Sequence, residues 1–226
     1  MLKRCEMLIL VASIWLTMPQ LSLAALSPKT QTASQQTVSI KFNVADAFNI
    51  QSASLRSLML ELYDCQPQDL QKNTKVSKEE FVEWVFEGPF DWKFDAIKNA
   101  QSIEALTLSF SQEYQGDRIL PLITGLYTML LHAYGGENEF TFNNTISLEN
   151  FTIATQNIEI ITTKLQNSLQ EKDSLNLHEV CIATAQKKLI EIKKKLLVDY
   201  EKISHVAGSN PLRSRIDESS GEFIKF

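Results

Sequence analysis

The chain is poor in the residues and motifs that carry most catalytic chemistry. Its 226 residues include three histidines and three cysteines, and the histidines stand far apart in the sequence. There is no Gly-x-Ser-x-Gly elbow, no glycine-rich phosphate loop, no His-Glu-x-x-His pair and no Cys-x-x-Cys pair. These absences favour a protein without catalytic residues, metal or cofactor, and leave open an enzyme whose site is assembled from separate helices.

The sequence also lacks a large excess of charge of either sign. Its formal net charge is −5, and a surface of this kind gives no electrostatic reason to bind nucleic acid. We therefore expect a protein partner or another component of the cell envelope rather than DNA or RNA.

The first apolar run is too short to anchor the protein in a membrane and has the pattern of a signal peptide. Lys3 and Arg4 precede the run 7–18, and Ser22-Leu23-Ala24 supplies the small residues at which a signal peptidase cleaves. We expect cleavage after Ala24, so that the mature protein is exported: periplasmic in a bacterium, otherwise secreted.

Removal of that segment leaves two cysteines, Cys65 and Cys181. Disulfides persist in exported compartments, so this pair predicts a bridge. A bridge over so long a loop would stabilise the fold by about 4 to 5 kcal/mol on the chain-entropy model. The alternative is two buried thiols that do not meet.

The stretch 119–134 is the most apolar part of the mature chain. Large apolar side chains fall on nearly every face of the helix that it predicts, as in an element buried on all sides. Asp117 is placed to cap its first turn, and Gly125 is expected to let a neighbouring helix approach closely. The stretch is short for a membrane span, which needs about 20 residues.

Helical periodicity surrounds this central stretch. The expected fold is all-α, with about six helices packed around the buried central helix. The alternation at 38–44 predicts at most one short β-ribbon, with 140–142 as its partner, or else an extended segment docked on the surface. The expected helices are 52–65, 77–88, 94–115, 119–134, 147–169 and 174–207. The expected organisation is a signal peptide (1–24), a flexible lead-in (25–37), one helical domain (38–207) and a polar tail (208–226).

Three polar residues of the central stretch are the candidates for binding a small ligand. Asp117 and Arg118 lie where a helix N-terminus and a guanidinium can hold an anion, and His132 lies among apolar residues. A cap, a salt bridge and a satisfied core histidine explain the same residues without a ligand. His178 and Cys181 are one turn apart, a metal half-site that a disulfide would remove.

Two stretches are candidates for contact with a partner. Six aromatic residues lie between positions 81 and 94, and we single out Trp84, Phe90 and Trp92, which either pack into the core or lie exposed for a partner. The last helix has a coiled-coil-like apolar seam and carries Lys187 and Lys194 on its outer face, where a solvated surface is the simpler explanation.

These observations lead to three hypotheses about function. The first is an exported, non-catalytic helical protein that acts through the seam of the last helix or through the aromatic run. The second is a binding module for a small apolar or anionic ligand beside the central helix, which requires a cavity near Gly125. The third is a hydrolytic enzyme, which requires His132, Asp117 and another acid to converge at one cleft.

Overall fold

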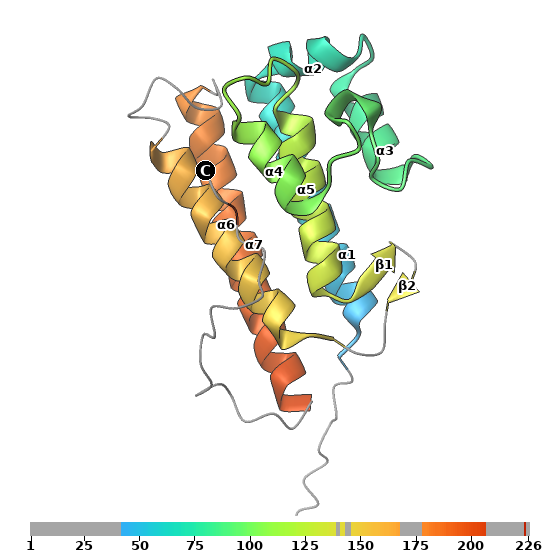
Figure 1. Ribbon diagram of the computed structural model, residues 1–226, viewed down its shortest axis with the longest axis vertical. Coiled ribbons are helices and arrows are strands. Elements are labelled where there is room, and N and C mark those ends of the chain that lie inside the picture. The colour runs from blue at the N-terminus through green and yellow to red at the C-terminus, as the bar shows by residue number, and fades with distance from the viewer. Residues whose placement is uncertain (1–41, 139–140, 143–145, 168–177, 207–223, 225–226) are drawn as a thin grey trace, which may run out of the picture. The chain divides into compact units, whose positions relative to one another are not determined.

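A computed structural model describes residues 42–138, 141–142, 146–167, 178–206 and Ile224. Its described part contains seven α-helices, one short 3-10 helix and one two-stranded ribbon (Figure 1). The helices are α1 (Val44–Cys65), α2 (Pro67–Asn73), α3 (Lys78–Glu87), η1 (Asp95–Ile97), α4 (Ser102–Phe110), α5 (Ile119–Ala133), α6 (Leu148–Asn167) and α7 (Glu179–Val206); the strands are β1 (Gly136–Asn138) and β2 (Thr141–Phe142). The expected mainly helical fold with a short ribbon is confirmed.

The central helix α5 is the most deeply buried element. Every one of its residues except His132 is buried, because α1, α4 and α6 all pack against it. The α4 contact is the closest: a Cβ atom added at Gly125 would lie 2.5 Å from Leu106 Cγ and 2.7 Å from the Ser102 carbonyl oxygen. Gly125 therefore allows the close helix approach that the sequence predicts.

Two expectations about β-structure need correction. Val44 does not end a strand but begins α1, because the Asn43 side chain caps that helix by accepting from the amides of Ala45 and Asp46 at 3.1 and 3.3 Å. The ribbon is instead local, since β1 pairs antiparallel with β2. A short loop closes at a lower entropic cost than the long one that the expected pairing required.

Three helix boundaries also differ from expectation. The first helix begins at Val44 rather than at 52, and Pro67, expected only to end it, also opens α2, where the lack of an amide proton costs little. The single helix expected at 94–115 is η1 and α4, separated by Lys98 and Asn99 in the left-handed region (φ 55° and 59°).

The last two long helices form a pair that lies against α1. The inner face of α7 is the seam predicted from the sequence, and its buried members are Ile182, Ala185, Leu189, Ile192, Leu196 and Ile203. This seam packs against α6 and α1 of the same chain, so it does not offer the surface for a partner that we expected there. The outer face of α7 is what remains.

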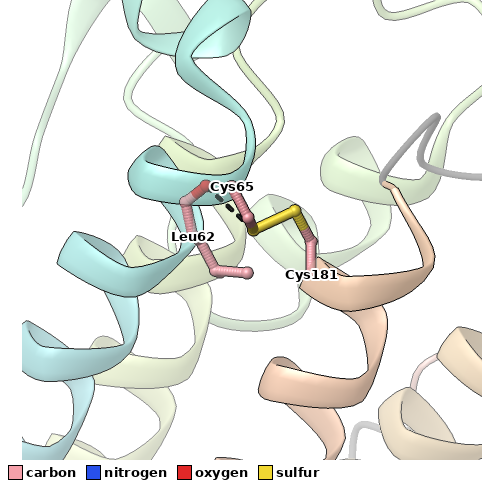
Figure 2. Close-up of a disulfide and its surroundings, with 3 residues drawn as sticks. All are labelled: Leu62, Cys65 and Cys181. Atoms are coloured by element: carbon pink, nitrogen blue, oxygen red, sulfur yellow. Dashed lines mark hydrogen bonds between the residues drawn. A yellow bond between two sulfur atoms is a disulfide. The ribbon is translucent and has the colours of Figure 1, made fainter.

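The expected disulfide is present. Cys65, the last residue of α1, is bonded to Cys181 in the first turn of α7, with an S–S distance of 2.00 Å and Cα atoms 5.7 Å apart (Figure 2). The bond fixes the end of one long helix to the start of another.

Several expectations fall on residues outside the described part of the chain. These are the signal peptide, the flexible lead-in, the beginning of the ribbon at 38–41, the helix start at Ser174 and nearly all of the polar tail. Within that tail Ile224 is described: it is buried, and its backbone amide donates to Asn157 Oδ1 at 3.2 Å.

Candidate functional site

Asp117 lies at the centre of a buried polar cluster where α1, α2 and α5 meet. Its Oδ1 accepts from the amides of Ile119 and Leu120 at 2.8 and 3.4 Å, which is the predicted cap of α5. Its Oδ2 accepts from the Tyr63 hydroxyl at 2.6 Å and from Asn73 Nδ2 at 2.7 Å. The carboxylate therefore already has four donors from this chain.

Burial changes the titration of this cluster. Removal from water, together with the charge of nearby Asp69, raises the pKa of Asp117 to about 7, although its hydrogen-bond donors act in the opposite direction. Burial and the neighbouring Asp117 carboxylate raise the pKa of Tyr63 well above its ordinary value. Lys72 donates to Asp69 Oδ1 at 2.6 Å.

Arg118, expected to hold an anion, is engaged within the protein. Its guanidinium donates to the carbonyl oxygens of Ser109, Ser111 and Tyr114 at 2.9, 2.7 and 2.7 Å. These three bonds hold the end of α4 and the loop that follows it, and they explain the residue's burial without a ligand.

His132 lies at the other end of α5 and is exposed. At the helical rise, it is about 20 Å along the axis from Asp117. The enzyme hypothesis requires these two residues to lie close together, and in the structure they do not.

The space beside Gly125 is occupied by α4. Leu106 and the backbone of Ser102 fill the side of α5 on which a ligand cavity was expected. The amide of Ser102 donates to Thr128 Oγ1 at 2.7 Å, which fixes α4 in that position. This contact favours helix packing as the role of Gly125.

A second buried polar network was missed by the sequence analysis. Tyr134 donates to Asp199 Oδ2 at 2.7 Å, and Gln51 Nε2 donates to the Tyr134 hydroxyl at 3.3 Å. Lys195 reaches the Asp199 carboxylate at 3.2 Å. The network joins α1, α5 and α7, and the only sequence signal for it is an acidic residue on the apolar seam of α7.

The aromatic run divides between the core and the surface. Trp92 is 6% exposed and stacks on Tyr127 of α5, with ring centroids 3.6 Å apart. Trp84 and Phe90 are 45% and 46% exposed. Only the latter two of our three candidates are therefore available to a partner.

The outer face of α7 carries a regular row of exposed residues, which we call the outer stripe: Val180, Ala183, Lys187, Ile190, Lys194 and Leu197. Val198 is exposed beside it. Among the described residues neither Lys187 nor Lys194 forms an ion pair, although the charge of Lys187 contributes to lowering the pKa of Glu61. Four other lysines of this helix pair with carboxylates, namely Lys188, Lys193, Lys195 and Lys202.

Two further results bear on the kind of site. Among the described residues, no group of three histidine, cysteine or acidic side chains is placed to hold a metal ion, and Cys181 of the expected half-site is in the disulfide.

None of the described helices has both the length and the apolarity needed to cross a bilayer.

Comparisons with protein-family models, with curated proteins and with solved structures gave no match for this chain.

Proposed function

We propose that the protein is exported and acts without catalysis, by binding a partner through the outer stripe of α7. The observation that supports this proposal is the exposure of large aliphatic side chains along one face of a helix whose other face is buried. Val180, Ile190, Leu197 and Val198 are between 44% and 69% exposed.

The arrangement of these residues matters more than their number. Single exposed apolar residues are ordinary on protein surfaces, whereas a contiguous apolar patch is typical of an interaction site. The outer stripe follows steps of three and four residues, so its members lie along one line of about 26 Å on the helix. A partner could bury this line in one contact.

The alternative functions have less support. For the ligand-binding module, the described neighbours of Gly125 fill the expected space and Arg118 is already bonded to three carbonyl oxygens. For a hydrolytic enzyme, the acid and the histidine lie at opposite ends of α5. Partner binding accounts for exposed features that those hypotheses leave unused.

Site-specific photo-cross-linking in the organism that makes the protein tests the partner. A photoreactive amino acid at Leu197 should give a discrete cross-linked species. The matched control is Ile50 on α1, which is 51% exposed against 44% for Leu197 but lies outside the stripe. Equal yields at the two positions, or none at either, would contradict the proposal.

The exported location has its own test. The intact mass of protein recovered from the extracellular or periplasmic fraction should correspond to a chain that begins at Ala25. Protein recovered only from the cytoplasm, at the mass of the full chain, would refute export.

A further inference from the structure

The short helix α2 is held in place by a buried acid rather than by buried apolar residues. Asp69 is the one residue of this helix that is buried, with 2% of its surface exposed. Its Oδ1 accepts from Lys72 Nζ at 2.6 Å, whereas its Oδ2 has no hydrogen-bond partner among the described residues. A buried carboxylate oxygen without a donor is unfavourable, so Asp69 holds α2 less firmly than an apolar side chain would.

Two hydrogen bonds connect α2 to the start of α5. Asn73 Nδ2 donates to Asp117 Oδ2 at 2.7 Å, and Lys72 Nζ donates to the carbonyl oxygen of Gly116 at 3.1 Å. Otherwise α2 packs mainly against α1, which precedes it in the chain. Because α5 is buried on nearly every side, a rearrangement between the two helices is expected to move α2.

The buried carboxylates of α2 and α5 have one ammonium group between them. Lys72 forms an ion pair with Asp69, while Asp117 forms none among the described residues, and the guanidinium of the adjacent Arg118 is bonded to three carbonyl oxygens. Burial, with a further contribution from the charge of Asp69, raises the pKa of Asp117 to about 7. Deprotonation of Asp117 therefore adds a second negative charge to a poorly hydrated cluster, where like charges repel strongly.

The other ionisable groups that face Asp117 keep their charge near neutral pH. Tyr63 of α1 and Tyr114 of the loop before α5 stay protonated, because burial raises the pKa of both hydroxyls, that of Tyr114 to about 12. Arg118 stays cationic, as arginine does throughout this range. Asp117 is therefore the member of the cluster whose charge changes as pH passes through 7.

We infer that α2 is a pH-sensitive element, which packs against the start of α5 while Asp117 is protonated and opens toward solvent when both Asp69 and Asp117 are ionised. Protonation keeps the cluster bonded, because a protonated carboxyl can donate to the Tyr63 hydroxyl across the same 2.6 Å. Opening hydrates Asp69 and separates the two charges. The disulfide at Cys65 limits the movement to residues that follow it.

This inference is independent of the proposed function, and hydrogen exchange with mass spectrometry on the intact, oxidised protein tests it. Exchange rates are divided by their intrinsic values, which themselves depend on pH. The protection of 67–74 should fall at least about tenfold between about pH 6 and pH 8, since each pKa unit lost on opening is a factor of ten. At every pH, 119–133 of α5 should stay better protected, because α2 opens while the core remains folded.

Two variants assign the effect to the acids. Asp117→Asn should abolish the change in protection of 67–74 with pH, and Asp69→Asn should reduce it, since only one carboxylate then remains in the cluster. Asp46→Asn, at an exposed carboxylate of α1, is the matched control and should keep the full change. Circular dichroism establishes that the variants are folded, and either acid variant suffices if the other does not fold.

Three outcomes would overturn the inference. The first is a protection of 67–74 that is the same at both pH values. The second is exchange of 67–74 at the rate of 119–133, which would show that α2 opens only when the whole protein unfolds. The third is a pH dependence that persists at full size in Asp117→Asn or in Asp69→Asn.

Discussion

The buried carboxyl of Asp117 links the stability of this protein to pH. Its pKa of about 7 in the folded protein lies above the ordinary value of 3.8, so between these limits the folded chain holds a proton that the unfolded chain loses. The contribution of Asp117 to stability is therefore fully present below about pH 4, decreases as pH rises, and levels off above about pH 7.

The variant Asp117→Asn should remove this dependence. Asparagine still caps a helix but does not titrate. The free energy of unfolding of the wild type should decrease by up to about 1.4 kcal/mol per pH unit between pH 5 and 7, and that of the variant should not. Urea denaturation at several pH values measures the difference from wild type. Asp46→Asn, at an exposed carboxylate in the first turn of α1, should keep the wild-type slope.

The two tryptophans of the aromatic run differ sharply in burial. Trp92→Ala removes a ring that stacks on Tyr127 and lies edge-on to Phe86, and should cost about 3 to 5 kcal/mol. Trp84→Ala, at a half-exposed ring, should cost less than about 1 kcal/mol. Urea denaturation compares the two, and similar losses would show that the assignment of core and surface is wrong.

Asp117 and the aromatic run also differ in how far the sequence alone could predict them. Asp117 was predicted as a cap because its position before an apolar run is informative by itself. The division of the aromatic run was left open, because the chain leaves helical periodicity after Gly88. Asp91 and Trp92 then adopt left-handed backbone angles (φ 49° and 57°), which turn Trp92 into the core and which periodicity does not encode.

At the scale of elements, the network around Tyr134 connects three helices through one hydroxyl. Tyr134→Phe would remove the hydrogen bond to Asp199, a carboxylate with no exposed surface, and should destabilise the fold by about 1.5 to 3 kcal/mol. Tyr200→Phe is the matched control, since that buried hydroxyl has no partner among the described residues and should cost almost nothing to remove. Thermal denaturation should separate the two variants clearly.

Elements with strong local signals were predicted well. The capping box before α3 is one case, since Ser77 Oγ accepts from the amide of Glu80 at 3.2 Å. The boundaries of α4 were not, because its start depends on Thr128 of α5, a contact between residues far apart in the sequence. Of the outer stripe, only the lysines were recognised from the sequence. Its aliphatic members can be recognised as exposed only when the packing of the inner seam is known.

At the scale of the whole molecule, the disulfide is the longest covalent constraint in the described fold. Cys65 and Cys181 are 116 residues apart and were predicted from the export signal and the even count of remaining cysteines. The bridge closes a loop that contains α2 to α6, so every described helix lies within or beside the segment that it constrains. Loss of the disulfide should therefore lower the stability of the whole described fold.

The double variant Cys65→Ser/Cys181→Ser should lower the free energy of unfolding by about 4 to 5 kcal/mol, because the unfolded chain regains the entropy of that loop. Urea denaturation measures the loss, and Ala183→Ser, at an exposed position in the same turns of α7, should be close to wild type.

Hydrogen exchange should show faster opening at the start of α7, where the bond is made, than at its end, where Asp199 and Ile203 remain buried. Since the outer stripe begins at Val180, the bridge also fixes the first turn of the proposed binding surface.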